Sequence, residues 1–170
     1  MTLKIRQATK ADAEVISQLG AKTFYDTFRQ FHSEEDIQLY IGKTYSREVV
    51  EKNMAIPEVI YLIGESGNKP LGYAKLKLNV QHELLKGKTI ELEKIYVLKD
   101  YLGTGCGAEL MKTAIHVAKE CQCDVLFLGV WQENKRAVDF YDRFGFEIFT
   151  TRQFQLGTES CDDHLMKLML

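Results

Sequence analysis

A glycine-rich turn at residues 102–107 constrains the fold most, because it lies between an apolar strand pattern and an amphipathic helix pattern. Residues 89–98 have the composition of a buried strand, and residues 108–118 repeat apolar side chains at helical spacing. Glycine permits left-handed backbone conformations and close approach of a ligand, while free amides at a helix start attract anions. The segment therefore predicts a strand, a phosphate-binding turn and a helix, although a glycine turn of this kind also serves tight packing alone.

A second apolar strand pattern follows this helix at residues 125–130. A strand, a helix and a second strand in this order form a crossover unit, which joins two parallel strands of one sheet. Beyond it, a polar turn leads into a further helix that ends at Gly145. The central part of the chain therefore predicts an α/β arrangement.

The remaining segments predict short strands and helices around this unit. Alternating or apolar runs between turn residues favour strands, and apolar residues at helical spacing favour helices. A hairpin is expected to turn at residues 66–70, and a polar loop spans residues 79–88. Expected strands are 3–8, 59–65, 71–78, 147–156 and 164–170, the last two joined by residues 157–160, and expected helices are 13–31, 33–41 and 46–54.

Composition predicts one soluble domain. At 170 residues the chain is long enough for one sizeable core, and 45% hydrophobic residues is ordinary for a globular protein. A net charge of −2 leaves no basic patch for nucleic acid, and no apolar run approaches the roughly 18 residues that span a bilayer. We therefore expect a single domain over residues 1–170 in a cytoplasmic protein with no nucleic-acid or membrane partner.

The four cysteines predict reduced structural thiols rather than a metal site. They lack the paired spacing of a zinc site, and the four histidines are scattered singly, so no metal is expected. Cys106 lies within the glycine turn near a helix start, where the pKa of a thiol can fall, but a side chain that faces the core is inert. We favour the core position for Cys106.

Two motifs in the second half of the chain resemble a known family. The sequence Leu-Glu-Lys-Ile-Tyr-Val at 92–97 runs into Gly-Thr-Gly-Cys-Gly at 103–107, and Asn-x-x-Ala-x-x-Phe-Tyr-x-x-x-Gly-Phe occupies 134–146. In this order and at this separation they resemble the GNAT superfamily of acetyl-CoA-dependent N-acetyltransferases. Many members carry Arg or Gln at the position of Leu102, so a side-chain contact to the cofactor is missing here while the backbone amides remain. The resemblance implies an α/β fold in which helices cover both faces of a mixed, mostly antiparallel seven-stranded sheet.

The resemblance also implies how acetyl-CoA binds. Its pyrophosphate lies on the backbone of the glycine turn, and its pantetheine arm pairs like a strand with Ile95 and Val97, where the central strand splays from the next one. Asn134 contacts the pantetheine or caps the following helix, and the two roles are compatible. The cofactor-binding residues expected on this basis are Ile95, Val97, Leu102, Gly103, Thr104, Gly105, Cys106, Gly107, Ala108 and Asn134.

The chemistry of amide formation points to two catalytic residues. In the family, a tyrosine at the position of Tyr141 lies near the cofactor sulfur and protonates the departing thiolate, although an aromatic residue on a helix face also suits the core. Glu93 is expected to take a proton from the amine through water, and Glu91 shares its strand face by alternation. A solvated face or an ion pair with Lys94 or Lys75 is the alternative role of these carboxylates.

Other side chains suit the acceptor pocket or the phosphate end of CoA. Trp131, at the end of an expected strand, walls the acceptor pocket or packs in the core. Lys135, Arg136 and Arg143 reach the 3′-phosphate of CoA or form a solvated helix face.

Within the superfamily, several segments resemble the bacterial PaiA subgroup of spermidine and spermine N-acetyltransferases. They are residues 23–28, 33–36, 40, 72–75 and 128–131, together with the helix that contains Tyr141. This resemblance implies a polyamine acceptor, and carboxylates at Glu34, Glu91 and Glu93 suit a multiply charged amine, although acidic residues at a helix start are also common capping chemistry.

Two alternative functions stay open at this point. The first is transfer to another amine, such as a protein N-terminus, an aminoglycoside or a small metabolite. The second is a CoA-binding regulatory protein without turnover. The sequence also leaves a homodimer open.

Overall fold

Apolar runs along the chain assemble into one seven-stranded sheet in the computed structural model, which describes residues 2–170. The strands are β1 (Leu3–Gln7), β2 (Val59–Ser66), β3 (Lys69–Leu78), β4 (Thr89–Val97), β5 (Val125–Trp131), β6 (Glu147–Leu156) and β7 (Glu159–Met169). Their order across the sheet is β1-β2-β3-β4-β5-β7-β6, and neighbours are antiparallel except for β4 and β5. The predicted mixed, mostly antiparallel sheet is therefore confirmed.

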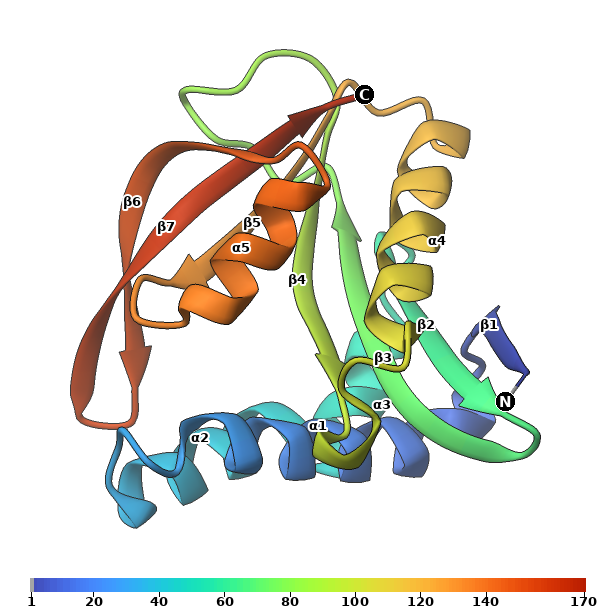
Figure 1. Ribbon diagram of the computed structural model, residues 1–170, viewed down its shortest axis with the longest axis vertical. Coiled ribbons are helices and arrows are strands. Elements are labelled where there is room, and N and C mark those ends of the chain that lie inside the picture. Colours follow the sequence, from blue (N-terminus) through green and yellow to red (C-terminus); the bar gives the residue numbers. More distant parts are fainter. Residues whose placement is uncertain (1) are drawn as a thin grey trace.

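Helices cover both faces of this sheet, as predicted. They are α1 (Ala13–Phe28), α2 (Glu34–Tyr45), α3 (Arg47–Met54), α4 (Cys106–Glu120) and α5 (Lys135–Arg143). One apolar cluster joins strand residues to Leu110 of α4 and Tyr141 of α5, and a second contains Phe24 of α1, Ile37 of α2 and Val50 of α3. In Figure 1, α4 and α5 lie in front of the sheet on either side of β4, whereas α1 and α2 cross its lower end. None of the helices in the described part of the chain is long and apolar enough to span a membrane.

Local signals fix most element ends. The Ser33 side chain accepts a hydrogen bond from the Asp36 amide at 3.1 Å, so the expected capped start of α2 is confirmed. The expected linker at residues 157–160 is wrong, because Leu156 already pairs with Glu159 across a two-residue turn. Gly157 has a φ of 61° there, which a tight hairpin turn requires. Pairing with β6 thus extends β7 over a polar stretch that carries little strand signal of its own.

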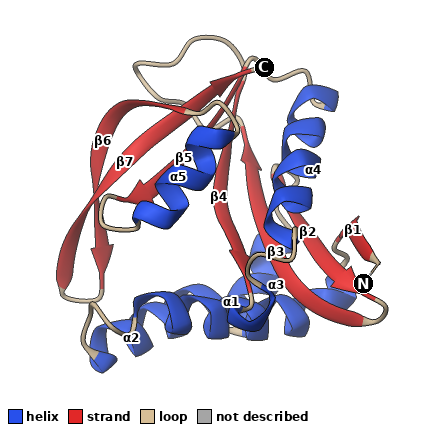
Figure 2. Cartoon of the chain, in the orientation of Figure 1, coloured by secondary structure: helices blue, strands red, loops and turns tan. Residues whose placement is uncertain are grey.

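The parallel strands β4 and β5 separate soon after they begin. They pair only at Thr89 with Val125, Ile90 with Leu126, and Glu91 with Phe127. Beyond these residues the two strands diverge, as Figure 2 shows. The edge of β4 that faces β5 is therefore unpaired from residue 92 onward, while its other edge continues to pair with β3 as far as Val97. This is the splay that the family resemblance implied.

Candidate active site

A cleft of about 750 Å³ is lined by the diverging ends of β4 and β5, the glycine turn before α4, and α5. Its other walls come from α1, the segment between α1 and α2, and strands β6 and β7. The cleft brings together most of the residues expected from the sequence: Glu93, Ile95, Val97, Leu102, Gly103, Gly105, Gly107, Ala108, Trp131, Asn134 and Tyr141. Four expected residues, Glu34, Glu91, Thr104 and Cys106, are not part of its lining.

The glycine turn presents backbone rather than side chains to this cleft. Gly103 and Gly105 have φ values of 82° and 92°, in the left-handed region that favours glycine, and Gly105 is the N-cap of α4. The Thr104 hydroxyl donates to the Tyr101 carbonyl at 2.7 Å, and Cys106 is fully buried. Burial raises the pKa of the Cys106 thiol to about 11, so the core position favoured for this cysteine is confirmed.

The start of α4 supplies hydrogen-bond donors for an anion. The Glu109 amide donates to the Gly105 carbonyl at 3.0 Å, and the preceding amides of the first turn lack a partner within the helix. Such amides, together with the positive end of the helix dipole, are the groups that attract an anion. Lys99, Arg136 and Arg143 also line the cleft, whereas Lys135 does not. Positive charge therefore gathers around the part of the cleft that suits phosphates.

Tyr141 lies on α5 with its ring packed at 5.5 Å from Phe140 and 6.0 Å from Phe146, measured between ring centroids. It is buried and also lines the cleft, so the packing considered from the sequence is present at a position on the cleft wall. Burial raises the pKa of the Tyr141 phenol far above its ordinary value. The hydroxyl therefore stays protonated at neutral pH and is a proton donor. Asn134 caps the same helix, accepting from the Ala137 amide at 3.3 Å, and it also lines the cleft.

Glu93 lies at a bulge in β4. Lys75 of β3 pairs with Lys94 and the next residue along pairs with Leu92, so Glu93 is the extra residue between them. The Glu93 carboxylate forms an ion pair with Lys75 at 2.6 Å and is still a lining residue of the cleft. The ion pair considered from the sequence is therefore present, at a residue that also lines the cleft.

Glu91 and Glu34 do not line the cleft, and each carboxylate has a partner in another element. The buried Glu91 carboxylate accepts from Arg152 of β6 at 3.1 Å. Arg152 reaches it by passing over Gly129 of β5, where a Cβ atom would lie 2.6 Å from the guanidinium. Glu34 accepts a hydrogen bond from the Tyr25 hydroxyl at 3.1 Å. The structure therefore places neither carboxylate in the acceptor role expected from the sequence.

Aromatic side chains form one wall of the cleft around Trp131. Its ring centroid lies 5.9 Å from that of Phe28, 5.0 Å from Phe31 and 5.2 Å from His32. All four residues line the cleft. Trp131 therefore packs against neighbouring rings and also forms part of the cleft wall. The segment between α1 and α2 completes this wall, and nothing in its local sequence pattern indicated that.

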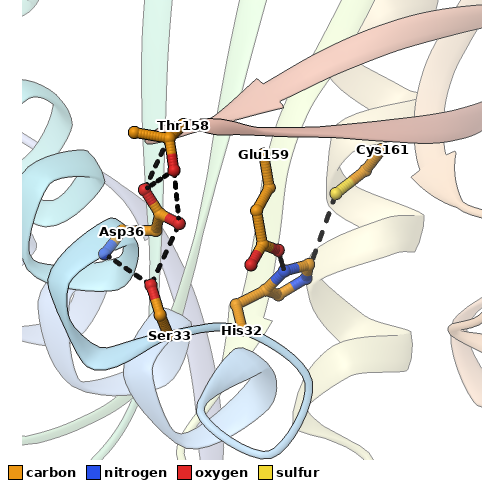
Figure 3. Close-up of polar contacts among 6 residues, drawn as sticks. All are labelled: His32, Ser33, Asp36, Thr158, Glu159 and Cys161. Atoms are coloured by element: carbon orange, nitrogen blue, oxygen red, sulfur yellow. Dashed lines mark hydrogen bonds and ion pairs between the residues drawn. The ribbon is translucent and has the colours of Figure 1, made fainter.

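Polar contacts hold this segment against the β6–β7 hairpin, as Figure 3 shows. Asp36 accepts from the Thr158 amide and hydroxyl at 2.5 and 2.8 Å, and these hydrogen bonds lower the pKa of its carboxyl. His32 Nδ1 lies 2.5 Å from Glu159 Oε2, and His32 Nε2 lies 4.0 Å from the Cys161 sulfur. These contacts fix the side of the cleft opposite α5.

The comparisons with known proteins agree with this geometry. The family model of the acetyltransferase (GNAT) family matches residues 21–146. The chain therefore belongs to the GNAT family of acetyltransferases, as the two motifs predicted. It is an acyltransferase. Within residues 2–170, no group of three or more His, Cys, Asp or Glu side chains is arranged to hold a metal ion.

Individual relatives cover the whole chain or part of it. An uncharacterised N-acetyltransferase encoded in the pepI 3′ region of Lactobacillus delbrueckii subsp. lactis is 30% identical over 169 residues, which cover 99% of this chain and 98% of that protein. The PaiA N-acetyltransferase of Thermoplasma acidophilum, solved in complex with coenzyme A, aligns over 100% of both chains with a TM-score of 0.82 and 20% identity. A probable spermine N(1)-acetyltransferase of Bacillus subtilis subsp. natto is 32% identical over 63 residues, which cover 36% of this chain and 41% of that protein.

Proposed function

We propose that this acetyltransferase transfers the acetyl group of acetyl-CoA to a primary amine of a polyamine such as spermidine or spermine. The observation that carries the transfer reaction is the divergence of β4 and β5 beyond Glu91 and Phe127. This opening gathers an unpaired strand edge, the helix-start turn and Tyr141 around one cleft. An enzyme that joins a long thioester to an amine needs a cleft that can hold both substrates, and the diverging strands line such a space.

Acetyl-CoA enters this cleft from the side of α4 and α5. Its pyrophosphate accepts hydrogen bonds from the amides of the turn at 103–108, and Arg136 and Arg143 neutralise further phosphate charge. Its pantetheine arm pairs with the free edge of β4 at Ile95 and Val97, because β5 has moved away from these residues. The thioester then lies in the opening between the two strands.

Acetyl transfer follows from attack by a neutral amine on this thioester. The nitrogen lone pair forms a bond to the carbonyl carbon, the carbon–sulfur bond breaks, and the Tyr141 hydroxyl gives its proton to the departing thiolate. A backbone amide near Val97 polarises the thioester carbonyl. Glu93 receives the proton of the amine through water, and its ion pair with Lys75 holds the carboxylate in place.

A polyamine suits the acceptor side of the cleft. Its nitrogens have a lysine-like pKa near ~10, so the enzyme must first bind a cation and then remove one proton. Carboxylates at Glu93 and Asp163 and the aromatic wall around Trp131 line the cleft, and both kinds of group attract ammonium ions. The relative from Bacillus named a probable spermine N(1)-acetyltransferase supports the same acceptor class over the 36% of this chain that aligns with it.

We expect a screen of acceptors to identify polyamines. Wild-type protein with acetyl-CoA is incubated with spermidine, spermine, aminoglycosides, amino acids and short peptides, and mass spectrometry reads acetylated products. Spermidine or spermine should gain an acetyl group, and the rate should fall with added salt, because charge attraction across a cleft is screened. Clear transfer to another class alone would contradict the polyamine assignment, and CoA binding with no transfer at all would favour the regulatory alternative.

A further inference from the structure

Asp163 is a nearly buried carboxylate inside the cleft that the sequence patterns did not single out. It lies on β7, where it pairs with Trp131 of β5 on one side and Arg152 of β6 on the other. Only 6% of the residue is exposed, and it is among the lining residues of the cleft. Asp163 therefore lines the cleft on β7, directly opposite Trp131 of the aromatic wall.

This carboxylate has no partner in the described part of the chain. No hydrogen bond and no ion pair within 4.0 Å reaches it, in contrast to the other cleft carboxylates Glu93 and Asp26, which pair with lysines. Lys94 and Arg152 lie in its neighbourhood, but the Lys94 ammonium donates to the Tyr40 hydroxyl at 2.5 Å and Arg152 binds Glu91. Each neighbouring cation is thus already engaged elsewhere.

An unpartnered carboxylate at such a position is unfavourable for the fold. Loss of hydration penalises the ionised form, which raises the pKa of Asp163 even though Arg152 and Lys94 act in the opposite direction. Its neighbours on β7 have smaller effects on this pKa: Asp162 raises it and His164 lowers it. A group that costs stability and faces a binding cleft is typical of a functional site.

We propose that Asp163 binds the cationic amine of the acceptor, its carboxylate accepting a hydrogen bond from the ammonium beside the ring of Trp131. This assignment rests on the proposed function and names the residue that recognises the acceptor. The ammonium supplies the missing partner of the carboxylate, and the rings of Trp131 and Phe28 in the aromatic wall add attraction for a cation. Cationic amines are thereby preferred to neutral and acidic acceptors.

Asp163→Asn tests this role, with Asp162→Asn as the matched control. Asparagine keeps the shape of the side chain and removes its charge, and Asp162 is an exposed neighbour on the same strand. In steady-state assays, Asp163→Asn should raise the KM for spermidine roughly 10-fold or more, with the KM for acetyl-CoA unchanged. Asp162→Asn should leave both values within about twofold of wild type. Equal effects of the two substitutions would overturn the assignment and leave the acetyltransferase function standing.

Two further measurements separate recognition from structure and from turnover. Calorimetric titration of spermidine into the CoA-loaded protein should give binding for wild type and Asp162→Asn and a loss of roughly 10-fold or more for Asp163→Asn, whether or not turnover is detected. The thermal midpoint of Asp163→Asn should equal or exceed that of wild type, because a charge that loses part of its hydration on folding is removed. A lower midpoint with unchanged spermidine binding would make Asp163 a structural residue and contradict the proposal.

Discussion

Tyr141→Phe is expected to lower turnover by about 10² or more while the affinity for CoA stays within about twofold of wild type. Phenylalanine keeps the ring that packs against Phe140 and Phe146. Only the proton donor is lost, so CoA must leave as a thiolate without a proton from the enzyme. Steady-state rates with acetyl-CoA and spermidine, together with calorimetric titration of CoA, measure the two quantities separately.

Tyr25→Phe is the matched control for this substitution. The Tyr25 hydroxyl donates to Glu34 at 3.1 Å and does not belong to the cleft lining, so its loss should leave turnover within about twofold of wild type. The raised pKa of the Tyr141 phenol adds a second expectation: deprotonation of this residue should produce no fall in rate between pH 7 and about pH 10. Equal turnover for Tyr141→Phe and wild type would assign Tyr141 to packing alone.

Gly105→Val is expected to abolish measurable CoA binding. Gly105 has a φ of 92° and is the N-cap of α4, and a β-branched residue is strained in this left-handed conformation. To relieve the strain, the turn must change its backbone, and the amides proposed to bind the pyrophosphate move with it. Calorimetry with CoA on the folded variant measures the effect. Unchanged CoA affinity in that variant would show that the phosphates bind elsewhere.

Gly67→Val separates this effect from a general loss of stability. Gly67 has a φ of 60° in the turn between β2 and β3, no atom lies within 4 Å of a Cβ added there, and it does not line the cleft. The backbone cost of valine is therefore similar at the two positions. Both variants should unfold at lower temperature than wild type, and only Gly105→Val should lose CoA.

Features set by neighbouring residues were predictable from the sequence. The glycine turn, the cap at Ser33 and the hairpin between β2 and β3 depend on residues within a few positions of one another. Their positions in the structure agree with the patterns, because backbone conformation and capping are local properties. The core position favoured for Cys106 is also the observed one.

Features that depend on pairing between distant strands were not predictable. Glu91 was expected at the acceptor side, but its partner Arg152 lies on β6, which only the assembled sheet brings near it. The alternation of side chains between the two faces of β4 also breaks at Glu93, because the bulge there inserts one residue. No local sequence pattern predicts this bulge. Asp163 is the strongest case, because its place beside Trp131 depends on the register between β5 and β7.

The most direct test of the account follows the acetyl group itself. Wild-type protein is incubated with acetyl-CoA labelled in the acetyl group and with spermidine, and the label is then counted on the polyamine while free CoA thiol is measured in parallel. Labelled acetylspermidine and free CoA are expected in equal amounts, at rates that depend on both substrates. Release of CoA without label on any amine, or no release in the presence of bound acetyl-CoA and spermidine, would contradict it.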